Sequence, residues 1–201
     1  MNRSVDILIP TYNRYKFSEQ ISKNINLQLY PFINKIIVAD DSDIDPKLNI
    51  ISKYPIEYHK VDRMSIGAKR NFLQSKSTAY YTCNMDTDDI YNPEYISRSI
   101  FNLIRTGKYI SGSADMIMLK DNTYYIHRCS LITSLNEATI VCVNNKRQYN
   151  ETNSSEGLGF LSGMASHIVE TNIKDIMVCL VHSNNSVNKT KFLKEECSKP
   201  F

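Results

Sequence analysis

The first half of the chain alternates short runs of apolar, often β-branched residues with segments in which apolar residues recur every three or four positions. The short runs predict strands and the longer period predicts amphipathic helices. The predicted strands are Val5–Pro10, Lys35–Ala39, Ile56–Lys60 and Ala79–Met85. The predicted helices are Arg14–Leu29, Asp45–Lys53, Ser65–Ser75 and Pro93–Arg105.

Two of these helices have particular support in the sequence. The first places Phe17, Ile21, Ile25 and Leu29 at four-residue spacing. The second has Pro46 in its first turn, where proline fits a helix. Strands that alternate with helices predict an α/β fold with a mainly parallel sheet and helices on both faces.

The second half has a different pattern. Four strand-like runs predict a mixed or antiparallel region: Tyr109–Leu119, Thr123–Arg128, Ala138–Val143 and Ile176–His182. A helix is predicted over Ser154–His167. Because no Pro-, Gly- or Ser-rich linker and no internal repeat separates the halves, we expect one domain over residues 1–201, with halves 1–105 and 106–201.

Composition excludes several classes of protein. The 201 residues contain 24 basic and 21 acidic residues, a net charge of +3 that is too balanced to indicate a nucleic-acid-binding protein. No apolar run approaches the ~20 residues of a membrane-spanning helix, and the first residues enter a strand without a signal-peptide stretch. Five scattered cysteines, Cys129 among them, form no C-x-x-C pair. We therefore expect neither a disulfide framework nor a zinc knuckle, and a reducing, cytoplasmic location.

The acidic cluster Asp86-Thr87-Asp88-Asp89 is the sharpest chemical signal. Asp86 and Asp88 are two residues apart and would project to one side of an extended backbone. Such carboxylates suit Mg²⁺ or Mn²⁺, which needs few protein ligands when substrate phosphates supply the rest. A solvated acidic turn is the alternative. The position after an apolar strand and before a helix begun by Pro93 favours the metal site.

A second acidic pair, Asp40 and Asp41, ends the strand Lys35–Ala39. A carboxylate there can accept hydrogen bonds from a ribose hydroxyl or a base N–H, and the alternative is a cap on the turn before Pro46. The chain has no G-x-G-x-x-G after its first strand and no G-x-x-x-x-G-K-[ST]. A dinucleotide oxidoreductase and a P-loop NTPase are therefore disfavoured.

The segment Ser65–Asn71 adds a glycine and two basic residues near a helix start. Gly67 would allow a ligand or another backbone to approach closely. Arg70 could bind phosphate with its planar guanidinium, whereas Lys69 fits better on an ordinary basic helix face.

In this order, Ile9–Arg14, Asp40–Ser42, Gly67–Asn71 and Asp86–Asp89 with Pro93 resemble the GT-A glycosyltransferases of the family 2 type. The resemblance covers the first half closely. It implies a Rossmann-like GT-A fold, in which 1–105 binds a nucleotide-sugar and 106–201 binds the acceptor.

The resemblance also implies roles for individual residues. Thr11 and Tyr12 would line the base, with Asp40 or Asp41 hydrogen-bonded to base or ribose. Arg70 would lie near the nucleotide or sugar, and Asp86 near the ribose. Asp88 would hold the metal, while Asp89 supports the loop. The rest of the implied donor site is Asn13, Arg14 and Thr87.

The second half resembles the family less closely. Family 2 enzymes are typically inverting and use an Asp or Glu base, and Glu156 in Ser154–Phe160 resembles it. A plain capping residue is the alternative, and Glu151 is the fallback base. His182 is similar to a C-terminal third metal ligand, although it could be a turn residue. Glu137 is a candidate for the acceptor pocket.

Together these observations predict a Mn²⁺- or Mg²⁺-dependent, inverting glycosyltransferase. It would move a sugar from a UDP-linked donor to a hydroxyl of a glycan, protein or lipid. The alternatives are a non-catalytic nucleotide-sugar-binding or scaffold module and a sugar-1-phosphate nucleotidyltransferase. The latter is disfavoured because Thr11–Tyr15 stands where a glycine-rich loop is expected.

Overall fold

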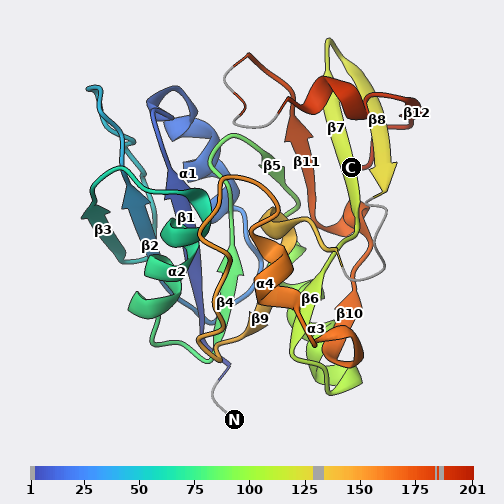
Figure 1. Ribbon diagram of the computed structural model, residues 1–201, viewed down its shortest axis with the longest axis horizontal. Coiled ribbons are helices and arrows are strands. Elements are labelled where there is room, and N and C mark those ends of the chain that lie inside the picture. Colours follow the sequence, from blue (N-terminus) through green and yellow to red (C-terminus); the bar gives the residue numbers. More distant parts are fainter. Residues whose placement is uncertain (1–2, 129–133, 184, 186–187) are drawn as a thin grey trace.

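Two sheets packed side by side organise the chain (Figure 1). The computed structural model describes residues 3–128, 134–183, 185 and 188–201. Within these residues a seven-stranded sheet has the order β10-β6-β9-β4-β1-β2-β3, and a five-stranded sheet has the order β12-β8-β7-β11-β5. The strands are β1 (Val5–Thr11), β2 (Ile33–Asp40), β3 (Ile56–Lys60), β4 (Tyr81–Asn84), β5 (Ile90–Tyr91), β6 (Ile110–Gly112), β7 (Asp115–Lys120), β8 (Thr123–Arg128), β9 (Val141–Val143), β10 (Ile168–Glu170), β11 (Met177–Leu180) and β12 (Glu195–Cys197).

The large sheet is parallel except at β9, which runs antiparallel to both β4 and β6. The central strands β4, β1 and β2 are mutually parallel neighbours. Because the carboxyl ends of parallel strands meet at one edge, Thr11, Asp40 and the residues after Asn84 lie at the same edge. The predicted mainly parallel α/β fold is confirmed.

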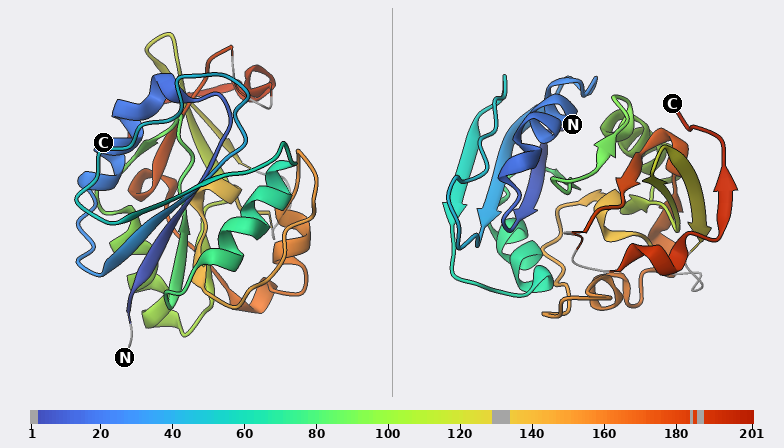
Figure 2. Two further views of the ribbon diagram at one scale, coloured as in Figure 1. Left: turned by 90° about the vertical axis from the view of Figure 1, so that its left-hand side faces the viewer. Right: turned by 90° about the horizontal axis from the view of Figure 1, so that it is seen from above.

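Helices cover both faces of the large sheet (Figure 2). The α-helices are α1 (Ser18–Asn26), α2 (Ile66–Lys76), α3 (Tyr95–Thr106) and α4 (Gly157–Leu161). The 3-10 turns are Tyr15–Phe17, Glu137–Thr139, Ala165–His167, Ile173–Asp175 and Lys189–Phe192. Ile21 of α1 and Ile96 of α3 share a core with Ile7 of β1. On the opposite face, Leu73 of α2 packs on Leu8.

The helix predicted over Asp45–Lys53 is absent, and the segment runs without regular structure beside α1. Three polar side chains of α1, at four-residue spacing, hold its backbone. Ser18 Oγ accepts from Asn49 N, Ser22 Oγ accepts from Ile51 N, and Asn26 Oδ1 accepts from Lys53 N. These hydrogen bonds replace those that a helix would have made internally.

Several other predicted elements were longer than the observed ones. The single strand Tyr109–Leu119 is split at Ser113 and Ala114 into β6 and β7, which belong to different sheets. The helix Ser154–His167 is reduced to α4 and a 3-10 turn. Its glycines explain this, because glycine is a poor helix former and Gly163 adopts a left-handed φ of 70°.

The described residues contain no helix long and apolar enough to cross a bilayer. The four described cysteines, Cys83, Cys142, Cys179 and Cys197, are free thiols. Cys129 lies outside the described residues.

Candidate functional site

A cleft of ≈ 1000 Å³ opens at the carboxyl ends of β1 and β4. The first half contributes the loop after β1, the start of α2 and the Asp86–Asp88 turn. The second half contributes the start of the 3-10 turn at Glu137 and the loop before α4. Of the predicted site residues, those that line the cleft are Thr11, Tyr12, Asn13, Arg14, Arg70, Asp86, Thr87, Asp88 and Glu156.

The loop after β1 is fixed by an acidic side chain from the neighbouring strand's loop. Asp43 accepts hydrogen bonds from the Tyr12 hydroxyl at 3.1 Å and from Asn13 Nδ2 at 2.7 Å. Asn13 has a φ of 53°, a left-handed conformation that asparagine tolerates. The loop therefore presents the Tyr12 ring to the cleft in a defined orientation.

Asp40 and Asp41 lie behind the cleft wall and do not line it. The buried Asp40 carboxylate accepts from Ser42 and from the Tyr58 hydroxyl. Asp41 accepts from Lys69 Nζ, from Arg63 Nη1 at 2.8 Å and from Met64 N at 3.2 Å. Each carboxylate is thus already engaged by the protein.

The pKa of Asp41 reflects this arrangement. Burial alone would raise the pKa of this carboxyl, but the hydrogen bonds from Lys69, Met64 N and Arg63 outweigh burial and lower it below its ordinary value. Lys69 Nζ also donates to the Thr11 carbonyl at 2.9 Å. The prediction that Lys69 lies on an ordinary basic helix face is wrong. Its side chain is 3% exposed and its ammonium group holds the end of β1 in place.

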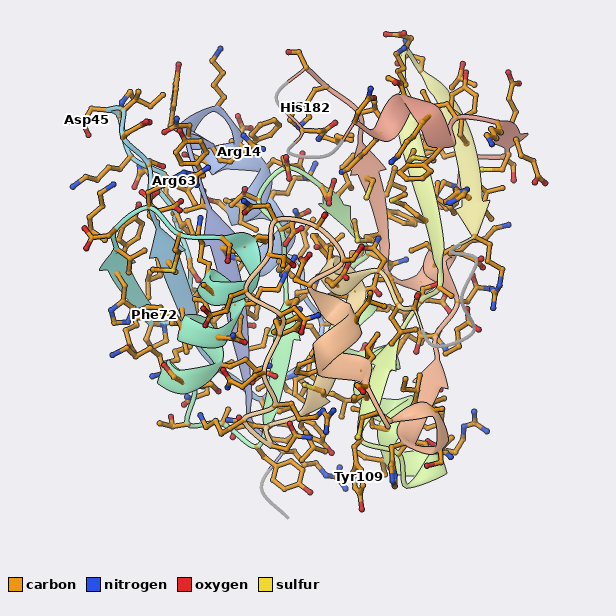
Figure 3. All side chains as sticks on the ribbon, viewed as in Figure 1. Arg14, Asp45, Arg63, Phe72, Tyr109 and His182 are labelled. Atoms are coloured by element: carbon orange, nitrogen blue, oxygen red, sulfur yellow. The ribbon has the colours of Figure 1, made fainter. Side chains whose placement is uncertain are left out.

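Arg63 was not predicted, and it lines the cleft while its guanidinium donates to Asp41. Its guanidinium carbon lies 3.6 Å from the centroid of the Tyr12 ring. Figure 3 shows Arg63 with Arg14 at the end of the molecule where β1 and β2 finish. No sequence motif contains Arg63, because its partners Tyr12 and Asp41 are brought to it by the fold.

Arg70 joins the two halves of the cleft. Its Nη2 donates to the two Asp86 carboxylate oxygens at 3.2 and 3.4 Å, and its Nε donates to Glu156 Oε1 at 3.3 Å. Burial would lower the pKa of this guanidinium, but the charges of Asp86 and Glu156 raise it overall. Arg70 therefore links a carboxylate of the first half, Asp86, to a carboxylate of the second half, Glu156.

Glu137 lies beside Glu156 in the cleft wall. Its Oε1 accepts a hydrogen bond from Gly157 N at 3.0 Å. A Cβ at residue 157 would lie 2.5 Å from that oxygen, so any larger residue there would force the Glu137 side chain to shift. Burial, and then the charge of Glu156, raises the pKa of Glu137 above its ordinary value.

The segment that bears Glu156 is docked on α2. Asn71 Nδ2 donates to the Tyr149 carbonyl at 3.0 Å, and Tyr149 N donates to Asn71 Oδ1 at 2.7 Å. Gly67 N donates to the Thr152 carbonyl at 3.1 Å. The close approach expected at Gly67 is therefore that of another backbone.

Asp88 lies in a turn, not on the extended backbone that was expected, so it and Asp86 contact different partners. Arg14 Nε donates to Asp88 Oδ2 at 3.1 Å, and His182 Nε2 lies 3.1 Å from the same oxygen. Burial would raise the pKa of Asp88, but His182, Lys189 and Arg14 lower it to about 2. The carboxylate is thus ionised at neutral pH.

Asp89 is buried next to Asp88. It accepts from Leu180 N at 3.0 Å and pairs with Lys189 Nζ at 3.7 Å. Burial raises the pKa of Asp89 to about 7, against the lowering effect of Lys189. Asp89 therefore ties its turn to β11, which fits the supporting role expected for it, and Lys189 is a second residue that the sequence did not reveal.

Several polar atoms of the cleft wall are available to bind a ligand. Among the described residues, buried polar atoms without a partner include four that belong to cleft residues: Thr11 Oγ1, Asn13 Oδ1, Arg70 Nη1 and Asn136 Nδ2. Buried polar groups are rarely left unpaired in proteins. The described cleft residues also include seven cations and four carboxylates, an excess of positive charge that suits an anion.

The donor set fits a hard divalent cation that shares its coordination with a ligand. No three His, Cys, Asp or Glu side chains gather into a complete metal cage within the part of the chain that the structure describes. Asp88 and His182 nevertheless offer one carboxylate and one imidazole, close together. That is enough for Mg²⁺ or Mn²⁺ when phosphates complete the coordination.

The comparison with known proteins decides the family. The profile of Glycosyl transferase family 2 matches residues 6–166. The chain belongs to this family. No curated protein matches the sequence. The match covers the whole cleft wall up to Glu156 and stops before β11.

Solved glycosyltransferase structures share the GT-A fold of this family 2 chain at low sequence identity. S. aureus TarS 1-349 has a TM-score of 0.69 and 14% identity, covering 88% of this chain and 60% of that one. The mannosyltransferase PcManGT from Pyrobaculum calidifontis, in complex with GDP-Man and Mn²⁺, has a TM-score of 0.65 and 13% identity, covering 92% and 59%. The family 2 chain therefore spans about 60% of these relatives.

Proposed function

We propose that the protein transfers a sugar from a nucleotide-sugar, UDP-linked, to an acceptor hydroxyl, with inversion and with Mn²⁺ or Mg²⁺. The observation behind the proposal is that Asp88 and Glu156 line one cleft, with Arg70 bonded to both Asp86 and Glu156. In this proposal residues 1–105 bind the donor and 106–201 the acceptor. A glycan, protein or lipid could supply the hydroxyl.

The donor would lie along the wall formed by the first half. Thr11 and Tyr12 would form the wall of the base site, and the unpartnered Arg70 Nη1 would donate a hydrogen bond to an oxygen of the nucleotide-sugar. Asp86 and Thr87 would lie near the ribose and Asp88 near the diphosphate. Known structures of related fold support this donor class: TarS was solved with UDP-GlcNAc, and PcManGT with GDP-Man and Mn²⁺.

Asp88 and His182 would hold the metal, which supplies positive charge to the departing diphosphate. The ionised Asp88 carboxylate suits this task because its pKa is about 2. Arg14, now bonded to Asp88, would remain close to the negative charge that develops on the leaving group.

Glu156 would act as the general base. As the acceptor hydroxyl forms its bond to the anomeric carbon, Glu156 takes the hydroxyl proton, and the bond from that carbon to the diphosphate oxygen breaks. Glu156 is 6% exposed and lines the cleft, whereas the fallback Glu151 is exposed and does not line it. The position therefore favours Glu156.

The test is UDP release from UDP-sugars, with a panel of acceptors, in Mn²⁺ and in EDTA. Asp88→Asn should abolish metal-dependent turnover. Glu156→Gln should bind UDP-sugar normally but lose transfer by ~10²–10⁴-fold, the typical contribution of a general base. Glu151→Gln is the matched control and should keep full activity.

The outcomes separate the alternatives. Full activity in Glu156→Gln with loss in Glu151→Gln would move the base to Glu151. Tight UDP-sugar binding without turnover by the wild type, with any acceptor, would favour the binding module. Unchanged turnover of Asp88→Asn in Mn²⁺ would reject the metal assignment.

A further inference from the structure

The wall on which a nucleobase would lie is closed by Arg63. Neither Asp40 nor Asp41 lines the cleft, and both carboxylates already accept hydrogen bonds from the protein. Arg63 and Tyr12 do line it. A base that enters at the end of β1 therefore meets the guanidinium before it can meet either aspartate.

The position of Arg63 is held from two sides. Its Nη1 donates to Asp41 Oδ2 at 2.8 Å, and the Asp41 side chain is 0% exposed. Its guanidinium carbon lies 3.6 Å from the centroid of the Tyr12 ring, which Asp43 orients through the hydroxyl. The salt bridge to Asp41 and the stacking on Tyr12 together fix the plane of the Arg63 guanidinium.

The outer side of Arg63 remains open, since 60% of its side chain is exposed. A guanidinium stacks on aromatic rings and on nucleobases with either face. Tyr12 occupies one face of this guanidinium. The other face is a flat, cationic surface of a cleft whose described lining residues carry an excess of positive charge.

We propose that Arg63 is the nucleobase platform of the donor site, with the base stacked on the guanidinium that Tyr12 supports from behind. This inference rests on the proposed nucleotide-sugar donor. Stacking depends on the plane of Arg63 and not on its charge alone. Lysine, which has the charge without the plane, cannot replace it.

The experiment compares ligands with and without a base. Binding of UDP and of pyrophosphate, each with Mg²⁺, is measured by calorimetry for the wild type, Arg63→Lys and Arg63→Ala. Base stacking is worth ~1–3 kcal/mol, so UDP affinity should fall roughly 5- to 140-fold in both variants. Pyrophosphate affinity should stay unchanged in Arg63→Lys, which keeps the charge.

Arg98→Ala is the matched control. Arg98 is also an exposed arginine bonded to a carboxylate at 2.8 Å, but it lies on α3 and does not line the cleft. It should leave the affinity for both ligands unchanged. Thermal unfolding of each variant checks that a loss of affinity is not a loss of folded protein.

Three results would overturn the proposal. Unchanged UDP affinity in both Arg63 variants would remove Arg63 from the base site. An equal loss for UDP and pyrophosphate would make its role purely electrostatic. Tighter UDP binding by Arg63→Ala would show that Arg63 obstructs the Tyr12 face. Failure of the wild type to bind UDP at all would instead reject the proposed donor, a distinct outcome.

Discussion

Replacing Gly67 by alanine should displace the segment that holds Glu156. A Cβ on Gly67 would lie 2.8 Å from the Asn150 carbonyl carbon, closer still to its oxygen, and 3.1 Å from Glu156 Cβ. Ordinary contacts begin at 3.4 Å, so the Asn150 peptide must retreat by more than half an ångström. The start of α2 cannot yield instead, because Leu73 packs on β1 and β2.

The expected size of the effect follows from this geometry. Overpacking of this kind costs ~1–3 kcal/mol, which lowers Tm by roughly 2–4 °C per kcal/mol in a protein of this length. Moving a catalytic group by about 1 Å can reduce turnover ~100-fold. UDP affinity should change little, because Thr11, Tyr12 and Arg63 are not displaced.

The assay measures UDP release, UDP binding and Tm on the same preparations. Gly163→Ala is the control: its added Cβ meets nothing within 4 Å, but its φ of 70° costs about 1–2 kcal/mol. It should lose stability and keep turnover. If Gly67→Ala keeps both wild-type turnover and wild-type Tm, the close contact at Gly67 does not hold the segment that bears Glu156.

Three further predictions concern buried charge. Asp41→Asn should lower the free energy of unfolding by about 3–5 kcal/mol, since Lys69 stays buried without its partner. Denaturant unfolding measures this, and Asp41→Asn with Lys69→Met should recover part of the loss. Asp6→Ala should cost at least ~2 kcal/mol in the same assay, because it leaves the buried donors of Ser77 and Ala79 without an acceptor. The pKa of Glu137 is raised in the folded protein, so above pH 4.5 the unfolded chain ionises this carboxyl more readily and the wild type loses stability. Glu137→Gln avoids this loss, so its free energy of unfolding should rise relative to that of the wild type as the pH increases. An equal difference between the two proteins at pH 4 and at pH 8 would contradict this.

The sequence predicted the elements whose pattern is local. The runs that became β1, β2, β3 and β4 are short and apolar, and their polar C-terminal residues come together because the strands are parallel. The segment 45–53 was mispredicted because its hydrogen bonds come from Ser18, Ser22 and Asn26 on another element. The split between β6 and β7 depends on pairing with β9, which is distant in sequence.

The candidate site was predictable in part for the same reason. Residues in ordered motifs, from Thr11 to Asp88, were identified, and the fold places most of them in the cleft. Arg63 and Lys189 were missed because each is defined by a partner far along the chain, Tyr12 for one and Asp89 for the other. Asp40 and Asp41 lie at the expected strand end, but both are buried and accept hydrogen bonds from the protein, so neither lines the cleft.

Metal-dependent binding of a nucleotide-sugar at Asp88 is tested by thermal unfolding of the wild type and Asp88→Asn with UDP-sugars, in Mn²⁺ and in EDTA. A ligand at 100 times its dissociation constant adds ~2.7 kcal/mol, a rise in Tm of roughly 5–10 °C. We predict this rise for the wild type in Mn²⁺, and its loss in EDTA or in Asp88→Asn. An equal rise in EDTA, or no rise with any nucleotide-sugar, would contradict a metal-dependent donor site at Asp88.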